Sequence, residues 1–246
     1  MQVALIREHG GPDVIRLEER SIPEPGPGEV LVRVLAVSIN HLDLWVRQGM
    51  PGMHIPFPRI LGCDGTGEVV SLGEGTELAS PLKVGDIVVI EPGYSSGLSA
   101  MDKAGLDHLS SDYEIRGEHS DGIDAEFVVI EARFLMLLPA GIDPIHAAAM
   151  PLAFVTAWGM LVTRVNVQPQ ETVLVLGGTS GVGSAAIQIA KYIGARVFAT
   201  AGTEEKCQLS RDLGADEAIL HNEAGWSRRV RELTDGRGAD VAVEHV

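Results

Sequence analysis

The residues of this chain best suited to chemistry form a glycine-rich hexapeptide, Gly178-Thr179-Ser180-Gly181-Val182-Gly183. It follows an apolar run, Val173–Leu176, and precedes apolar residues at helical spacing up to Ile193. A strand that enters a helix through a glycine turn leaves backbone N–H groups and the positive end of the helix dipole facing one point. The pattern therefore favours a pyrophosphate site, with candidate binding residues Gly178, Ser180, Gly181, Val182 and Gly183.

Two registers of the dinucleotide-binding fingerprint fit this segment. One places glycines at 178 and 183 with Ser180 in the middle position, and the other uses Gly181 and Gly183 with Ala186 third. The same hexapeptide is also compatible with an ordinary turn between a strand and a helix that binds no ligand. The elements that follow decide in favour of nucleotide binding.

The chain after the hexapeptide alternates strand-like and helix-like segments. Strand-like runs begin near Val173, Arg196, Glu217 and Asp240, and helical patterns occupy Val182–Ile193, Glu204–Leu213 and Trp226–Leu233. This alternation predicts an α/β domain with a parallel sheet and helices on both faces, the topology of dinucleotide-binding domains.

The residues before position 140 have a different pattern, in which short β-type runs alternate with turns rich in glycine and proline. The runs are Val3–Arg7, Ile15–Glu18, Val30–Val37, Gly67–Leu72, Ile87–Ile90, Ala125–Ile130 and Phe134–Leu138. They predict a β-rich barrel or sandwich. Pro144–Val162 has helical spacing broken at Pro151 and would join the two parts. We therefore expect domains at residues 1–140 and 141–246.

Composition and charge exclude several classes of protein. The chain has 246 residues, 45% hydrophobic and 22% charged, with a net charge of −15 from 19 basic and 34 acidic residues. That charge argues against a general affinity for nucleic acid or an anionic membrane. No window reaches the length of a transmembrane helix. The two cysteines, Cys63 and Cys207, cannot form a disulfide framework, so we expect a cytoplasmic protein whose partner is a small-molecule substrate.

Five short motifs in order along the chain resemble the medium-chain dehydrogenase/reductase superfamily, which includes zinc alcohol dehydrogenases and quinone oxidoreductases. They are Asn40-His41-Leu42-Asp43, Gly62-Cys63-Asp64-Gly65, Val84-Gly85-Asp86, Leu152–Trp158 and Gly181-Val182-Gly183. The resemblance implies a GroES-like catalytic domain followed by a Rossmann domain, a nicotinamide cofactor, and a cleft between the domains. It further implies that roughly the last quarter of a family member lies outside this chain, and that the parent protein is a homodimer. The last apolar strand ends at Val246, where an exposed sheet edge indicates either a fragment or another element that covers the edge.

The positions that correspond to catalytic zinc ligands depart from the zinc-dependent members. Those members carry a cysteine at the position of Asn40, a Gly-His-Glu triplet at Gly62-Cys63-Asp64, and a third ligand near Met150–Leu152. Zinc requires thiolate, imidazole or carboxylate ligands, and of these positions only Cys63 and its neighbour Asp64 offer one. We therefore expect no catalytic zinc. An alcohol or aldehyde dehydrogenase with residual zinc is the alternative.

The lobe that binds structural zinc in zinc-dependent members has four cysteines spaced C-x2-C-x2-C-x7-C. This chain keeps the spacing at Ser96, Ser99, Asp102 and Ser110 but has no cysteine there. Neutral serines cannot replace thiolates on zinc. A different ion could be held by Asp102, Asp107, His108 and Asp112. The favoured expectation is instead a metal-free, poorly ordered loop over Tyr94–Asp112.

An asparagine at position 40 resembles the zinc-independent, quinone oxidoreductase-like members. In these, hydride passes from NADPH to an activated C=C bond or a quinone. The resemblance makes Asn40 a candidate amide donor to a developing enolate oxygen, and the neighbouring catalytic candidates are His41, Asp43, Cys63 and Asp64. A residue directly after a strand is equally compatible with a turn-capping role.

The end of the second strand of the α/β domain bears on the choice of nucleotide. An NAD site places an acid there to accept from the ribose 2′-OH, whereas this chain has Ala201 and Gly202. Thr203 and Lys206 offer a hydroxyl and an ammonium group for a 2′-phosphate, and their spacing resembles NADPH-using members. Glu204 and Glu205 count against this assignment, although the helix dipole explains acids in a first turn. We expect NADP, with NAD as the alternative.

Thr156 lies on the helix that enters the second domain. The resemblance implies that it faces the nicotinamide, and the structural alternative is a threonine bonded to its own helix backbone.

Together these features predict an NADP(H)-dependent, zinc-independent oxidoreductase that reduces a quinone, an enone or a similar small carbonyl compound. A nucleotide-binding protein with little or no turnover is the alternative from another class.

Overall fold

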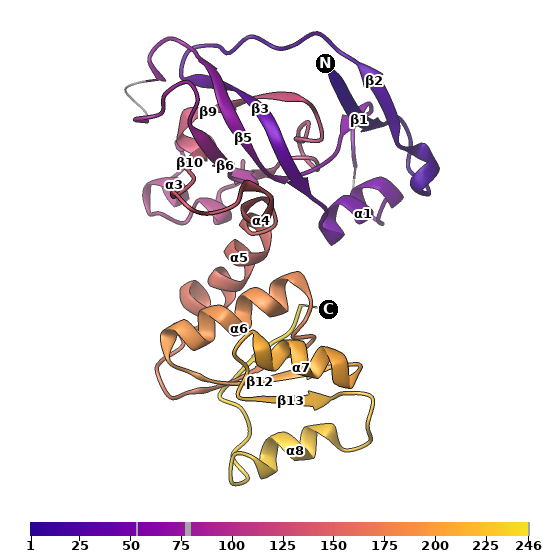
Figure 1. Ribbon diagram of the computed structural model, residues 1–246, viewed down its shortest axis with the longest axis vertical. Helices are drawn as coiled ribbons and strands as arrows, with labels where there is room; N and C mark the ends of the chain where they lie inside the picture. Colours follow the sequence, from indigo (N-terminus) through magenta and orange to yellow (C-terminus); the bar gives the residue numbers. More distant parts are fainter. Residues whose placement is uncertain (53, 77–79, 246) are drawn as a thin grey trace. The chain divides into compact units, whose positions relative to one another are not determined.

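Strand β5 (Asp64–Leu72) is the central strand of a five-stranded antiparallel sheet. The structure is a computed structural model, and it describes residues 1–52, 54–76 and 80–245. The chain forms two units, unit 1 from Met1 to Leu152 and unit 2 from Ala153 to Val246, each with its own hydrophobic core (Figure 1). The sequence-based boundary lay earlier, between 140 and 141, because the helix at 144–148 packs with unit 1.

Unit 1 contains antiparallel sheets with the strand orders β10-β6-β5-β3-β9, β2-β1-β4 and β7-β8. Its strands besides β5 are β1 (Gln2–Ile6), β2 (Arg16–Glu19), β3 (Glu29–Ser38), β4 (Arg59–Ile60), β6 (Ile87–Ile90), β7 (Gly93–Tyr94), β8 (Glu114–Ile115), β9 (Phe127–Glu131) and β10 (Leu135–Leu137). Its helices are α1 (His41–Gln48), α3 (Ala100–Lys103) and α4 (Pro144–Ala148), with short 3-10 turns at Pro12–Val14, Asp107–Leu109 and Ala132–Phe134.

The large sheet of unit 1 is held by alternate apolar residues. Val30 and Val32 of β3 are fully buried and pack with Val69, Val88 and Ile90, because alternate residues of a strand point to the same face. Each of the seven predicted strands corresponds to a strand of the structure, which confirms a β-rich first part. The two-residue strands and the helices α1 and α3 were not predicted.

Helix α4 belongs to unit 1 because it packs on β3 and β5. The Thr66 hydroxyl donates to the Pro144 carbonyl at 3.0 Å, and Asp143 caps the first turn of the helix by accepting from the Ile145 N–H. Helix α5 (Pro151–Trp158) follows, so the predicted break at Pro151 separates the two helices.

The segment Tyr94–Asp112 is a folded lobe, and the expectation of a poorly ordered loop is wrong. Ser99 caps α3 by accepting from the Asp102 N–H, while the Asp102 carboxylate accepts from the Ser95 hydroxyl at 2.7 Å. The Ser110 hydroxyl contacts Ser99 at 2.8 Å and also Asp112. Ser99, Asp102 and Ser110 stand at three of the four positions that carry the zinc-binding cysteines in zinc-dependent members, and hydrogen bonds join these three residues.

Unit 2 contains one parallel sheet with the strand order β13-β12-β11-β14. Its elements after α5 are a π-helical turn (Gly159–Arg164), β11 (Thr172–Val175), α6 (Gly181–Ile193), β12 (Arg196–Ala201), α7 (Glu204–Asp212), β13 (Glu217–Leu220), α8 (Trp226–Glu232) and β14 (Val241–Val243). Every predicted strand and helix of this unit is present.

Helices cover both faces of the parallel sheet, as predicted. On one face, α6 packs through Ala186 and Ile187 against Val173 and Val197. On the other, Val230 of α8 packs with Phe198 and Ile219. The odd and even residues of the strands thus contribute to two separate cores. The described chain has no helix long and apolar enough to cross a membrane.

The side-chain carboxylate of Asp124 in unit 1 makes no hydrogen bond to the described residues. It is half-buried, and it lies so close to Gly62 that a Cβ on that glycine would be 2.2 Å from Oδ1. Burial, reinforced by the negative charge of Asp43, raises the pKa of Asp124 to about 6. The folded state therefore binds the Asp124 proton more tightly than the unfolded chain does, and ionisation of this acid destabilises the fold.

Replacing Asp124 with Asn is expected to stabilise the protein at pH 7 to 8 by up to about 3 kcal/mol. Below pH 3.8, the ordinary pKa, the acid is protonated in both states, so the difference from wild type vanishes. Between 3.8 and about 6 only the unfolded state ionises, and the folded wild type loses stability as pH rises. Urea unfolding of both proteins from pH 4 to 8 measures this difference. The exposed control Asp13→Asn should show none, and an equal difference for Asp124→Asn at pH 4 and 8 would contradict the assignment.

Candidate functional site

The turn between β11 and α6 brings the predicted phosphate-binding residues together. Gly178 and Gly183 are buried and Gly181 is exposed. A Cβ on Gly183 would lie 2.2 Å from the Gly177 carbonyl oxygen, and one on Gly178 would lie 2.8 Å from both Ala199 Cβ and Ser210 Oγ. Glycines 178 and 183 therefore allow α6 and α7 to approach the sheet, as in the register with Ser180 in the middle position.

Gly181 has a different role from the two buried glycines. The nearest atom to a Cβ placed there is Ala153 Cβ of α5, at 3.7 Å, so an alanine fits. Packing within the described chain therefore does not require a glycine at this position. Thr156 lies one turn after Ala153 on α5, and its hydroxyl makes no hydrogen bond within the described chain. The structural alternative of a bond to its own helix is therefore not observed.

The first turn of α6 presents backbone donors without acceptors. Ser180 is the N-cap, and its hydroxyl oxygen accepts from the Gly183 N–H at 2.9 Å. The N–H groups of Gly181 and Val182 have no acceptor among the described residues. These two donors and the helix dipole fit the diphosphate of a dinucleotide.

The end of β12 holds the residues predicted to contact the ribose. Thr203 caps α7 by accepting from the Lys206 N–H, and both residues are exposed. Two residues that sequence reasoning missed lie beside Gly202. Asn222 donates its Nδ2 hydrogen to the Gly202 carbonyl at 3.1 Å, and the His221 imidazole is close enough that a Cβ on Gly202 would be 3.4 Å from Nε2. Both follow β13, which pairs with β12.

The predicted catalytic residues of unit 1 form a hydrogen-bonded group at the start of α1. Asn40 is the N-cap, and its backbone N–H donates to the Asp43 carboxylate at 2.6 Å. Its side-chain Nδ2 donates to Asp64 Oδ2 at 3.0 Å and lies 3.6 Å from Cys63 Sγ. Asp64 Oδ1 accepts from the Leu152 N–H at 2.9 Å, in the first turn of α5. Asp64 thus connects Asn40 to α5.

This geometry corrects one expectation about Asn40. Its amide hydrogens point to Asp64 and Cys63, so they are not free donors for a substrate oxygen in this structure. The capping interpretation of Asn40 describes its position better. His41 is exposed, with its ring 6.1 Å from that of Trp45, and Leu44 completes the exposed face of α1.

Burial and neighbouring carboxylates favour the neutral thiol at Cys63. Cys63 is fully buried, and burial together with the charges of Asp64 and Asp43 raises the pKa of its thiol. Burial also raises the pKa of Asp43, and raises that of Asp64 to about 6. Among the described residues no group of three or more His, Cys, Asp or Glu side chains could hold a metal ion.

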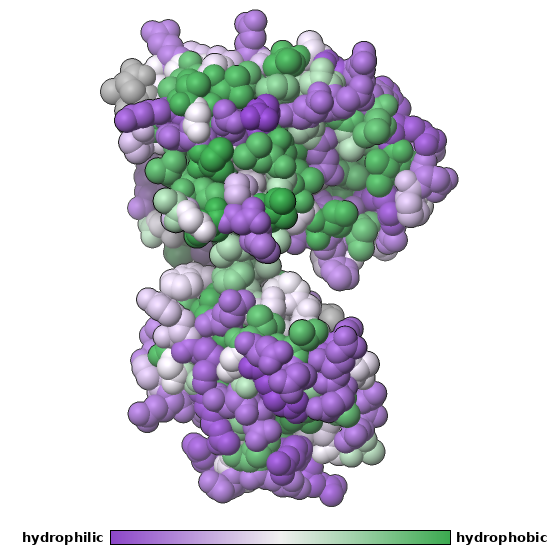
Figure 2. Space-filling view, viewed as in Figure 1, coloured by the Kyte–Doolittle hydropathy of each residue, from purple (hydrophilic) through white to green (hydrophobic). Residues whose placement is uncertain are grey.

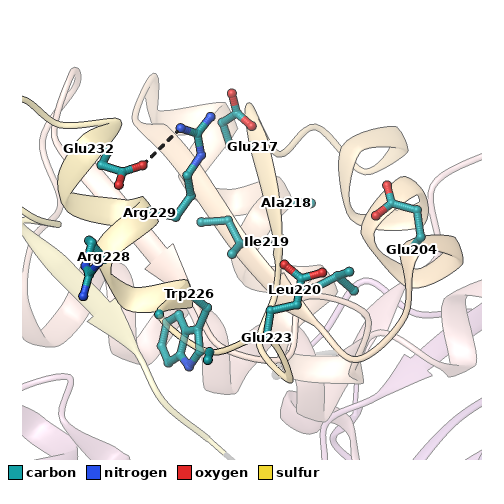
Figure 3. Close-up of a pocket in the computed structure, with 12 residues that line it drawn as sticks. Glu204, Glu217, Ala218, Ile219, Leu220, Glu223, Trp226, Arg228, Arg229 and Glu232 are labelled. Carbon is teal, nitrogen blue, oxygen red and sulfur yellow. Dashed lines mark hydrogen bonds and ion pairs between the residues drawn. The ribbon is translucent and has the colours of Figure 1, made fainter.

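An open hollow of about 640 Å³ lies elsewhere in unit 2, along β13 and α8 (Figure 3). Four carboxylates line it, from Glu204, Glu217, Glu223 and Glu232, against the guanidinium groups of Arg228 and Arg229. Arg229 already pairs with Glu232 at 3.4 Å. This excess of negative charge is unsuited to a phosphate, so we do not place the cofactor there.

Two family profiles match the chain. The profile described as "Alcohol dehydrogenase GroES-like domain" matches residues 26–140, and "Zinc-binding dehydrogenase" matches residues 181–246. These segments fall in unit 1 and unit 2 respectively.

Relatives of very different length align with the chain. Phthioceranic/hydroxyphthioceranic acid synthases of Mycobacterium tuberculosis and Mycobacterium bovis are 32% identical over 98% of this chain, which spans only 10% of their length. An NAD-dependent alcohol dehydrogenase of Sulfolobus acidocaldarius is 31% identical over 100% of this chain and 71% of its own length.

Solved structures agree with these relatives. The crystal structure of an NAD-dependent alcohol dehydrogenase is 45% identical, with a TM-score of 0.95, and the match covers 100% of this chain and 71% of that one. Escherichia coli quinone oxidoreductase complexed with NADPH is 27% identical, with a TM-score of 0.80, over 100% of this chain and 66% of that one. The chain therefore belongs to the medium-chain dehydrogenase/reductase superfamily.

Proposed function

We propose that this chain belongs to an NADP(H)-dependent oxidoreductase that reduces a quinone, an enone or a similar small carbonyl compound without zinc. The observation that carries the proposal is the pair of unpartnered N–H groups of Gly181 and Val182, at the carboxyl end of a parallel sheet. A bound reduced nicotinamide supplies the hydride. The residues of the chain bind and orient the dinucleotide and the substrate.

The preference for NADP(H) rests on the residues around Gly202. No acid occupies Ala201 or Gly202, where an NAD site would accept from the 2′-OH. Hydroxyl, ammonium, imidazole and amide groups follow the paired strands β12 and β13, on Thr203, Lys206, His221 and Asn222. Glu204, the nearest acid in sequence, is paired with Arg211 at 3.0 Å, which offsets its charge.

The zinc-free assignment rests on the chemistry of the side chains at the start of α1. An amide stands at one ligand position, at Asn40, and amides are not among the thiolate, imidazole and carboxylate ligands that zinc prefers. The similarity to an NAD-dependent alcohol dehydrogenase at 45% identity keeps an alcohol or aldehyde dehydrogenase as the second candidate.

The exposed face of α1 supports an apolar organic substrate. His41, Leu44, Trp45 and Gln48 are spaced three and four residues apart and are all exposed, whereas Val46 on the opposite face is buried in the core. Hydrophobic side chains also gather in several places on the face of unit 1 seen in Figure 2. We assign α1 to substrate contact, with Asp43 and Asp64 holding its first turn through Asn40.

Oxidation of NADPH by the full-length protein, followed at 340 nm against a panel of enones, quinones and aldehydes, tests the proposed function. We expect turnover with enones or quinones that treatment with a chelator does not change, and no stoichiometric zinc by metal analysis. Chelator-sensitive turnover of aldehydes alone would instead establish the second candidate. Tight NADPH binding without any turnover would show a nucleotide-binding protein.

Gly181→Ala and Gly183→Ala are expected to separate ligand binding from folding. The alanine at 181 meets no atom closer than 3.7 Å in the chain but occupies the approach to the free N–H groups. It should weaken NADPH binding by about tenfold or more, measured by fluorescence titration, at unchanged melting temperature. The alanine at 183 would place Cβ 2.2 Å from a carbonyl oxygen and should lower the melting temperature. Wild-type affinity in Gly181→Ala would argue against a diphosphate at this turn.

Lys206→Ala is expected to weaken NADPH binding by about tenfold while leaving NADH binding unchanged, because only NADPH carries the 2′-phosphate. Paired titrations with the two nucleotides at constant salt measure this. Lys83→Ala, far away in sequence and in the other unit, is the matched control and should bind both nucleotides like wild type. A wild-type protein that prefers NADH by tenfold would refute the assignment of the nucleotide.

A further inference from the structure

The strand order of unit 2 places the ends of β11 and β14 side by side. These strands are adjacent and parallel, and the chain leaves β11 toward β12 on one side while β14 lies on the other. Ligands of open parallel sheets bind outside the carboxyl ends of the strands at such a switch in direction. The glycine turn follows β11 at this point, and Glu244 and His245 follow β14.

His245 connects the end of β14 to the cap of α6. Its Nε2 lies 2.5 Å from the hydroxyl oxygen of Ser180. That oxygen already accepts from the Gly183 N–H at 2.9 Å, so the Ser180 hydroxyl proton is available to Nε2. Burial lowers the pKa of His245, and the charge of Glu244 raises it by less, which favours the neutral ring. The ring proton of this tautomer sits on Nδ1.

The Nδ1 atom of His245 is buried and has no hydrogen-bond partner among the described residues. A buried donor without an acceptor is unfavourable, because it has lost its hydrogen bond to water. An acceptor oxygen that arrives with a ligand would remove this penalty. The phosphate and ribose oxygens of a dinucleotide are acceptors of that kind.

Resting on the cofactor site proposed above, we propose that His245 is a positioning residue that also contacts the cofactor. Its Nε2 accepts from Ser180 and fixes the N-cap of α6, and its Nδ1–H donates to an oxygen of the bound dinucleotide, on the diphosphate or the adjoining nicotinamide ribose. The histidine would thereby couple β14, the cap of α6 and the ligand.

Two substitutions separate the two halves of this role. The amide of Gln reaches the position of Nε2 and that of Asn the position of Nδ1. In the full-length protein, His245→Gln should keep the melting temperature and bind NADPH about tenfold more weakly. His245→Asn should bind NADPH within about threefold of wild type but lose the contact with Ser180. Ser180→Ala should therefore lower the melting temperature less in the His245→Asn protein than in the wild-type protein.

The matched control is His146→Gln, an exposed histidine of unit 1 whose side chain is 84% accessible, which should leave binding unchanged. The ligand control is adenosine 2′-monophosphate, which lacks both phosphates of the diphosphate and the nicotinamide ribose. Its affinity should be the same for wild type and His245→Gln. Equal loss for adenosine 2′-monophosphate and NADPH would overturn the proposed contact, as would wild-type NADPH affinity in His245→Gln.

Imidazole ¹⁵N spectra of the wild-type protein provide a second measurement should a variant fail to fold. We expect the His245 proton on Nδ1, and a shift of that signal when NADPH is added. A proton on Nε2, or an Nδ1 signal unaffected by NADPH, would overturn the inference. Failure of the wild type to bind either nicotinamide nucleotide would refute the proposed function itself, so the two failures are distinguishable.

Discussion

The close approach of α6 to the end of β11 is the constraint on which unit 2 depends. Gly177 adopts a left-handed backbone, with φ of +67°, and Gly183 packs against its carbonyl oxygen. A side chain at 183 would push the first turn of the helix away from the strand. The N–H groups of Gly181 and Val182 reach the end of the sheet only because no side chain intervenes. The packing of this turn and the exposure of its two free N–H groups thus depend on the same short contact.

Periodicity made most of the fold predictable from the sequence. In unit 2, strands alternate with amphipathic helices, and the apolar residues of each element repeat with the period of that element. Val173 and Phe198 lie on neighbouring strands and pack in different cores. The two-residue strands β4, β7 and β8 are too short to carry a period. The lobe at Tyr94–Asp112 was misjudged because its order comes from serine and aspartate hydrogen bonds, which leave no apolar pattern.

The candidate site was less predictable, because its geometry depends on partners distant in the chain. The orientation of the Asn40 amide is set by Asp64, and Asp64 is in turn bonded to Leu152. No local pattern around residue 40 indicates either contact. His245 was missed for the same reason: its position is defined by the order β13-β12-β11-β14, which places the end of the last strand next to a turn formed 65 residues earlier.

The acidic character of the chain bears on how it could hold an anionic cofactor. A net charge of −15 opposes a phosphorylated ligand, yet charges farther away than about 10 Å are largely screened at physiological ionic strength. Backbone N–H groups act in direct contact and carry no mobile charge that neighbouring carboxylates could neutralise. Glu204, next to Thr203 in sequence, is itself paired with Arg211. Attraction by the N–H groups and the dipole of α6 can therefore outweigh the repulsion from the net negative charge of the chain. The affinity of such a site for an anion depends more on the position of the helix than on the net charge.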